Sequence, residues 1–371
     1  MRGVEALPNQ IEERKADHIR ICLDEEVQAR EVSTGFDDIS LVHRALPEIE
    51  RDKIDLSATV FNHKFAAPII VGAMTGGTKE TMEINATIAE AVEELGLGMG
   101  VGSQRAAIED PGLERTFAIT RERAPTSFLI ANIGAPQLVR GYGVKEAKRA
   151  IEMIDANALA IHLNPLQEAV QPEGETNYRR VLHRIGEIAQ ALDTPVIVKE
   201  TGSGIAAEEA RKLEAMGVAG IDVAGLGGTS WAAVEYYRAK RAQDEFRQRL
   251  GETFWDWGIP TAISLVEVTQ SVRLPVIASG GVRSGLDIAK ALALGASLSS
   301  IALPILRPAT KGLVDVKKAL QLIIEELRNV MFLVGADSIP KMMEFPIVIC
   351  GKSAEWLRMR GFQPELYARR T

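Results

Sequence analysis

Residues 275–302 read PVIASGGVRSGLDIAKALALGASLSSIA, which is one complete strand–loop–helix–strand unit. An apolar run over 275–279 is followed by a glycine-rich loop, a helix-period segment over 286–294, and a second apolar run over 298–302. The two runs lack polar alternation, which is typical of strands buried on both faces of a parallel sheet. The stretch therefore predicts the end of an α/β fold that has a parallel sheet.

Six further apolar runs of the same kind precede this unit. They occupy residues 68–73, 98–101, 127–132, 157–162, 195–199 and 220–223. Amphipathic segments at 80–95, 181–191, 206–216 and 316–334 have the period of helices. The first runs start about 30 residues apart, the size of one βα unit. Eight such units predict a closed (β/α)8 TIM barrel, with an open doubly wound sheet as the competing architecture.

Two parts of the chain fall outside this repeat. Residues 1–67 form an N-terminal arm that is expected to contribute to a substrate site, and residues 68–371 form the barrel, in a single domain overall. An insertion after the sixth strand is expected to contain one charged helix over 231–250 and an aromatic stretch over 254–257. Both the arm and the insertion are candidates for closing the end of the barrel where active sites lie.

Composition and charge exclude several classes of protein. The chain has 371 residues, 46% of them hydrophobic, and a formal net charge of −7, which argues against a nucleic-acid binder. Cys22 and Cys350 cannot form a disulfide framework. The N-terminus is too polar for a signal peptide, and no apolar run is long enough to span a membrane. We expect a soluble cytoplasmic α/β enzyme.

The loop from Ser279 to Gly285 is the sharpest functional motif. Its glycines allow the backbone to approach an anion closely, and it opens a helix whose N-terminus offers unpaired N–H groups. The eighth strand ends in Ala302 and Leu303, whose backbone lies where barrels complete a phosphate site. The loop therefore predicts phosphate binding, and its alternative is a tight turn without a ligand.

Charged and polar residues end several other predicted strands. Lys199 ends the fifth strand, where a lysine serves as a Schiff base or as a fixed cation beside an anionic cofactor, unless it only pairs with Glu200 at the surface. His162 and Asn164 end the fourth strand on one side, and Glu168 follows. One carboxylate provides too few ligands for a structural metal site but suits Mg²⁺ held partly by a substrate phosphate. The alternative is a loop in which the histidine only satisfies its own hydrogen bonds.

The remaining candidates are weaker when each is taken alone. Trp231 follows the sixth strand and could wall an apolar substrate, although a single Trp more often packs, and Glu235 four residues later is more often solvated. Small and hydroxyl residues after the first three strands suit a bound ring system, and Arg105 suits a phosphate. All five histidines precede residue 184, so no late histidine can act as a general base.

Together these motifs resemble the type 2 isopentenyl-diphosphate isomerase family, of an archaeal or bacterial kind, over nearly the whole chain. The resemblance rests on RKADH (14–18), GFDDI (35–39), AMTGG (73–77), GSQR (102–105), HLNPLQE (162–168), VKE (198–200), GGTSW (227–231) and SGGVR (279–283). One departure is SLSS at 297–300, where the family more often has Asp and Gly. That segment leads into the last strand, away from the expected substrate.

The resemblance implies an enzyme that interconverts isopentenyl and dimethylallyl diphosphate with FMN, kept reduced by NADPH or NADH, and Mg²⁺. It implies that FMN is held by Ala73, Met74, Thr75, Ser103, Asn132, Lys199, Thr229, Gly281, Arg283, Ala302 and Leu303. The substrate would be bound by Arg14, Lys15, Ser103, Arg105, His162, Asn164 and Gln167, and Mg²⁺ by Glu168. The implied catalytic residues are Gln167, Glu235, Trp231 and Lys199.

The chemistry agrees with this set of residues. Protonating an unactivated alkene creates a tertiary carbocation, which a negatively charged reduced flavin beside it would stabilise. Lys199 would favour that anionic flavin, and Trp231 would exclude water. Family resemblance further implies a homotetramer or larger assembly. The alternatives are an FMN-dependent oxidoreductase similar to hydroxy-acid oxidases and a non-catalytic phosphate-binding barrel.

Overall fold

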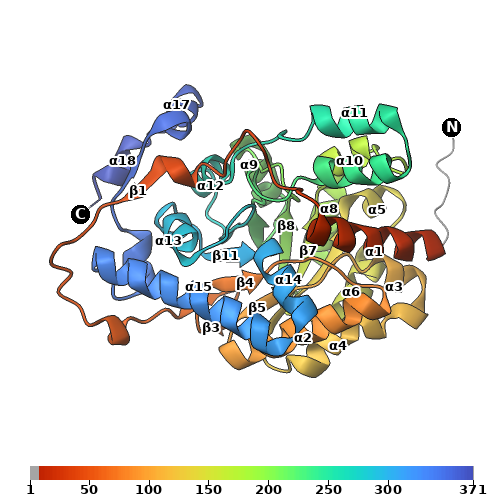
Figure 1. The fold of residues 1–371 in the computed structure, drawn as a ribbon, viewed down its shortest axis with the longest axis horizontal. Coiled ribbons are helices and arrows are strands. Elements are labelled where there is room, and N and C mark those ends of the chain that lie inside the picture. The colour runs from red at the N-terminus through yellow and green to blue at the C-terminus, as the bar shows by residue number, and fades with distance from the viewer. Residues whose placement is uncertain (1–7, 371) are drawn as a thin grey trace.

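Eight parallel strands close into a barrel at the centre of the computed structural model, which describes residues 8–370 (Figure 1). Around the barrel the strands run in chain order, with β11 hydrogen-bonded to β4. The strands are β4 (Ile69–Val71), β5 (Gly98–Gly100), β6 (Phe128–Gly134), β7 (Ala158–His162), β8 (Val196–Lys199), β9 (Gly220–Asp222), β10 (Val276–Ala278) and β11 (Leu298–Ile301). Each predicted run overlaps one of them, with β6 extending two residues beyond its run, so the (β/α)8 barrel is confirmed and the open sheet is excluded.

Helices surround the barrel and bury its outer face (Figure 1). Those of the barrel layer and its loops are α2 (Lys79–Leu95), α3 (Arg105–Glu109), α4 (Arg115–Arg123), α5 (Ala135–Val139), α6 (Val144–Met153), α7 (Pro165–Val170), α8 (Val181–Ala191), α9 (Ala207–Ala215), α12 (Thr261–Thr269), α13 (Gly285–Ala293), α14 (Leu303–Lys311) and α15 (Leu313–Val334). Within residues 8–370, none of the helices is long and apolar enough to cross a membrane.

The insertion after the sixth strand differs from its prediction. Instead of one helix over 231–250, the chain forms α10 (Trp231–Arg241) and α11 (Glu245–Thr253). Gln243 takes a left-handed φ of 57°, which stops the first helix, and the Asp244 side chain accepts a hydrogen bond from the backbone of Arg247 to start the second. The periodicity continued across this break, so the sequence pattern alone did not reveal it.

Separate parts of the N-terminal arm pack against different regions of the fold. Its helix α1 (Pro8–Asp24) contacts α3, α10 and α14 at the carboxyl end of the barrel. Its later part forms β1 (Ile39–Leu41), which pairs antiparallel with β12 (Ile347–Ile349) near the C-terminal helices. The other elements of the arm and the C-terminal region are β2 (Ala58–Val60), β3 (His63–Phe65), α16 (Ile339–Met343), α17 (Gly351–Met359) and α18 (Glu365–Ala368), besides short 3₁₀ turns.

The hairpin of β2 and β3 closes the amino end of the barrel. Phe65 is fully buried, and its ring lies 5.3 Å from that of Phe128, centroid to centroid. Phe61, in the turn, stacks on Phe128 at 5.8 Å. These rings join the apolar side chains that point into the barrel from β4 to β11. The amino end is therefore a packed floor, which leaves the carboxyl end for ligands.

Candidate active site at the carboxyl end of the barrel

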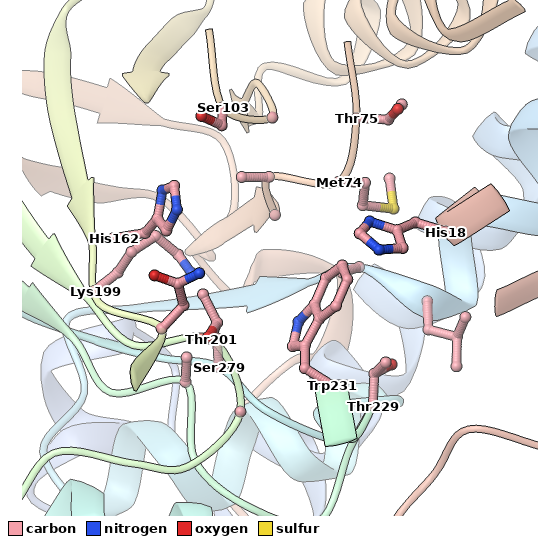
Figure 2. A pocket seen from close by; sticks show the side chains of 18 of the residues that line it. His18, Met74, Thr75, Ser103, His162, Lys199, Thr201, Thr229, Trp231 and Ser279 are labelled. Carbon is pink, nitrogen blue, oxygen red and sulfur yellow. The ribbon is translucent and has the colours of Figure 1, made fainter. Parts of the chain in front are cut away.

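A cavity of about 280 Å³ lies at the carboxyl ends of the strands, and α1 contributes Lys15 and His18 to its lining (Figure 2). Every predicted site residue except two lines it. Those residues are Lys15, Ala73, Met74, Thr75, Ser103, Arg105, Asn132, His162, Asn164, Gln167, Glu168, Lys199, Thr229, Trp231, Gly281, Arg283, Ala302 and Leu303. Glu235 lies behind the wall, and the side chain of Arg14 falls outside the described part of the structure.

Three polar side chains stand side by side on neighbouring strands at this end. His162 on β7 is in register with Lys199 on β8, and Lys199 is in register with Asp222 on β9. Because parallel strands present their carboxyl ends at the same edge, all three reach the cavity. Asp222 was not selected from the sequence. The sequence did contain a signal for it, because Asp222 is a charged residue within the otherwise apolar run at 220–223.

The proton of His162 can be placed from its partners. Asn132 Nδ2 donates to the carbonyl oxygen of Val101 at 3.0 Å, so the Asn132 Oδ1 atom, 2.8 Å from His162 Nδ1, is an acceptor. Burial, with the positive charges of Lys199 and Arg105, lowers the pKa of His162 to about 3. The ring is therefore neutral, it carries its proton on Nδ1, and its Nε2 atom is an acceptor.

Lys199 does not form the surface ion pair considered as its alternative role. Its Nζ atom donates to the backbone oxygen of Glu200 at 2.5 Å. The Glu200 carboxylate instead accepts three backbone N–H bonds from residues 201–203. Burial raises the pKa of Glu200 to about 7, although these bonds and Lys199 oppose the rise. The ammonium group of Lys199 consequently remains at the cavity wall.

The glycine-rich loop is shaped for close approach. Gly280 and Gly281 have left-handed φ values of 96° and 72°, and a Cβ on Gly281 would lie 2.4 Å from Thr34 Cγ2. Arg283 lines the cavity, and its buried NH2 group has no hydrogen-bond partner among the described residues. A buried guanidinium nitrogen without a partner is costly unless an anion binds it. The site thus fits a phosphate group at this corner.

A second polar group lies across the cavity on α7. Asn164 Nδ2 donates to Glu168 Oε1 at 2.9 Å, and Glu168 Oε2 accepts from Gln171 Nε2 at 2.7 Å. The Gln171 Oε1 atom is buried without a partner in the described chain. Oxygen atoms of one carboxylate and neighbouring amides are the hard ligands that Mg²⁺ takes. No cluster of three or more acidic, His or Cys side chains occurs within the described residues, so a metal here would need ligands from a substrate.

Glu235 is a buried carboxylate and not the solvated helix residue that is usual at such a position. It is 2% exposed, and Glu235 Oε1 lies 3.1 Å from His18 Nε2 and 3.5 Å from Gln167 Nε2. Its other oxygen accepts from Arg238 at 2.6 Å. Burial opposes ionisation, but His18 and Arg238 hold the pKa of Glu235 below its ordinary value.

Helix α1 brings two of its residues to the cavity from within one chain, at different sides of it. Lys15 Nζ donates to the backbone oxygens of Gly76 and Ser103, at 2.5 and 3.0 Å. The His18 ring meets the Trp231 indole edge-on at 5.2 Å, as Figure 2 shows. The Lys15 ammonium group is therefore held by backbone oxygens at the cavity. His18 stood in the RKADH motif, but its contact with α10 could not be read from spacing.

The segment at 297–300 lies closer to the cavity than predicted. The segment at 297–300 was expected to lead away from the site, but Ser300 is 7% exposed and lines the cavity. Its Oγ would lie 2.7 Å from a Cβ on Gly72, so the first and last strands meet closely here. The reason is that alternate residues of a barrel strand face inward.

The fold and the phosphate-shaped corner define a barrel of the flavin-binding class. The sequence profile described as FMN-dependent dehydrogenase matches residues 8–112 and 173–345. Among solved structures, a putative lactate oxidase from Pediococcus acidilactici aligns with a TM-score of 0.65 at 18% identity, covering 95% of each chain. A mandelate oxidase aligns with a TM-score of 0.58 at 19% identity, covering 86% of this chain and 90% of that one. These two likenesses support the fold alone.

Relatives of about 50% sequence identity identify the family within this class of flavin-binding barrels. An isopentenyl-diphosphate delta-isomerase from Methanosarcina mazei is 50% identical, with 95% of this chain and 96% of that protein aligned. One from Pyrococcus furiosus is 52% identical, with 94% of this chain and 89% of that protein aligned. The chain therefore belongs to the isopentenyl-diphosphate delta-isomerase family, within the FMN-dependent dehydrogenases.

Proposed function

We propose that this chain interconverts isopentenyl diphosphate and dimethylallyl diphosphate, with reduced FMN and Mg²⁺ bound in the cavity. The observation that carries the proposal is the layout of the cavity wall. A phosphate-shaped corner lies at one edge, where the Arg283 NH2 group has no partner among the described residues, and the Asn164, Gln167 and Glu168 group lies at another, with Lys199 between them. The named relatives at about 50% identity support the same substrate pair.

FMN fits the corner next to β10 and β11. Arg283 and the backbone at Gly281 would hold its phosphate, together with Ala302 and Leu303 at the start of α14. Lys199 would lie beside the ring system, with the other cofactor contacts from Ala73, Met74, Thr75, Ser103, Asn132 and Thr229. When bound and reduced, FMN supplies a proton-exchanging nitrogen and a ring that carries negative charge. NADPH or NADH is the proposed reductant.

Cationic and amide groups would bind the substrate diphosphate. Lys15 and Arg105 supply positive charge, and Ser103, His162 and Asn164 supply hydrogen-bonding atoms. Arg14 is assigned to the same task from the sequence. Glu168 would hold Mg²⁺ against the diphosphate, with the Gln171 oxygen facing the ion or one of its waters.

Gln167, Glu235 and Trp231 would handle the hydrocarbon end. The Gln167 amide stands between the cavity and Glu235, so a proton taken from the substrate has a path towards a carboxylate. His18 and Arg238 keep that carboxylate ionised and fixed in the free enzyme. Trp231 forms an apolar wall that excludes water from a cationic intermediate.

The deciding experiment uses the full chain without oxygen. The protein is incubated with FMN, NADPH, Mg²⁺ and isopentenyl diphosphate in D₂O, and the substrate is followed by NMR. We expect dimethylallyl diphosphate that carries deuterium, formed only when the flavin is reduced. A bound, reduced flavin without any product would favour an oxidoreductase of the hydroxy-acid oxidase type, and absence of flavin binding would overturn the cofactor assignment.

The arrangement of the arm and the assembly are further parts of the proposal. Because α1 reaches the cavity of its own chain, residues of the arm would close the substrate site in cis. The remainder of the chain, residues 68–371, would hold the cofactor. A homotetramer or larger assembly is proposed from the family, and light scattering of the purified protein tests it.

A further inference from the structure

Asp222 is a buried carboxylate at the cavity that none of the roles above uses. It is 6% exposed, it ends β9, and it is directly in register with Lys199 on β8. Both side chains line the main cavity and also the small space beneath it inside the barrel. A charged group is expensive at such a position unless it has partners and a task.

Two hydrogen bonds fix the position of the Asp222 carboxylate. Its Oδ1 atom is hydrogen-bonded to Ser279 Oγ at the end of β10, and it accepts the backbone N–H of Ala224 at 3.3 Å. Ala224 itself has a left-handed φ of 36°, so the carboxylate also caps a tight turn. Both groups can act as donors, which favours the ionised form of the acid.

Lys199 provides the opposite charge. The pKa of Asp222 is raised above its ordinary value because burial outweighs the charge of Lys199 and the bonds from Ser279 and Ala224, which oppose the rise. No ion pair within 4 Å joins Lys199 to a carboxylate in the described chain, so the two charges act across the cavity wall. On the other side of Lys199, His162 is neutral. The Glu200 carboxylate is occupied by the backbone N–H groups of residues 201–203.

We propose that Asp222 is a positioning residue that carries the counter-charge of Lys199, and that it limits how strongly Lys199 favours a negatively charged ring in the cavity. The inference rests on the proposed binding of FMN. In a water-poor site, two opposite charges at fixed positions produce a smaller field at the ligand than the cation alone. Asp222 would thereby set the balance between FMN with a reduced, anionic ring and FMN with an oxidised, neutral ring.

Asp222→Asn is the decisive variant because it keeps the shape of the side chain. Asparagine still accepts from Ala224 and Ser279 through Oδ1, so the turn is retained while the charge is lost. Without the counter-charge, the protein should bind reduced FMN about tenfold more tightly relative to oxidised FMN. That corresponds to a rise of ~30 mV in the two-electron midpoint potential. The potential is measured on FMN-loaded protein with a redox dye.

The matched control is Glu267→Gln. Glu267 is also fully buried, but its partners are Trp356 and Arg360 on the C-terminal side, and it does not line the cavity. Its loss should leave the flavin potential unchanged. Asp222→Asn in a Lys199→Met background should give a smaller rise than in the wild type, because without the cation the pKa of Asp222 rises further and less of the acid carries the charge that the substitution removes.

An unchanged or lowered potential in folded, FMN-loaded Asp222→Asn would overturn the proposal and leave Asp222 as a turn cap. If that variant does not fold, Ser279→Ala tests the same point, since it keeps the acid but removes a donor. Relative to wild type, its potential should then be raised at low pH and normal at high pH, and equal potentials throughout would count against the idea. Wild-type isomerisation, measured in the same preparation, separates this result from failure of the proposed function.

Discussion

The two ends of the barrel are built from the same eight strands, yet they have opposite chemistry. At the amino end, Phe61, Phe65 and Phe128 pack ring against ring with apolar strand residues, and a hairpin of the arm closes the floor. At the carboxyl end, Lys199 and Asp222 stand in register around an open cavity. Helix α1 of the same arm covers that end.

The contrast indicates that the amino end of the barrel, the floor, contributes to stability, whereas the carboxyl end, the mouth, carries the chemistry. The floor gains free energy from apolar burial and holds no side chain that a ligand needs. The mouth keeps several buried charges and, at Arg283, a guanidinium nitrogen without a partner in the described part of the chain, which cost stability unless a ligand compensates them. Substitutions at the floor should therefore change unfolding but not turnover per folded molecule, and substitutions at the mouth should do the reverse.

The largest effect should come from the mouth. Gln167→Ala removes the amide between the cavity and Glu235, so isomerisation should slow by roughly 10⁴-fold, or about 5 kcal/mol of barrier. FMN binding, followed by flavin fluorescence, should stay normal because Gln167 is not among the residues assigned to FMN. Unchanged turnover would remove Gln167 from the mechanism.

The floor gives the next largest effect, on a different property. Phe65→Ala removes a fully buried aromatic ring from the floor and should lower the free energy of unfolding by about 4 kcal/mol. Urea unfolding measures the loss, and turnover is then normalised to the folded fraction. A drop in normalised turnover as large as that of the Gln167 variant would contradict the separation of the two ends.

Arg283→Gln tests the free-energy cost of the guanidinium nitrogen that has no partner within residues 8–370. With FMN bound, the lost charged hydrogen bonds should weaken its affinity about 100-fold, or about 3 kcal/mol. Without FMN, the variant should be no less stable than wild type, because a buried polar group without a partner is removed. Arg283→Lys is the control that keeps the charge, and equal FMN affinity in all three proteins would argue against a phosphate at this corner.

Much of the mouth could be predicted because local rules act there. A βα repeat fixes which strand ends meet, so Lys199, His162 and Gly281 could be assigned to one cavity from spacing alone. Family motifs extended the set to Lys15 and Glu168. The roles of these residues remain predictions, whereas their common location is observed.

The rest depended on contacts between distant parts of the chain. The pairing of β1 with β12 joins residues about 300 positions apart, and no local pattern encodes it. The burial of Glu235 comes from His18 and Arg238, of which only Arg238 is near in sequence. Asp222 gave a signal, a charge inside an apolar run, but a single charge does not reveal that Ser279 and Lys199 surround it.

The smallest effect compares one histidine from each end. Burial lowers the pKa of both, with Arg121 acting on His63 at the floor, and Lys199 and Arg105 acting on His162 at the mouth. Since the folded pKa of His162 is about 3, the unfolded chain binds a proton first as the pH falls below about 6.5. Stability is thus complete above that pH and declines below it. Between pH 6.5 and 5.5, His162→Gln should lose about 1 kcal/mol less than wild type in urea unfolding.

A ligand should then distinguish the two histidines. Inorganic diphosphate with Mg²⁺, bound at the mouth, places negative charge near His162 Nε2 and should raise the pKa of that ring, so wild type should lose less stability at pH 5.5 when the ligand is present. Part of this gain should vanish in His162→Gln and remain in His63→Gln, because the floor lies at the opposite end of the barrel. The reverse pattern would assign the low-pH loss to the floor and place the titrating group away from the diphosphate.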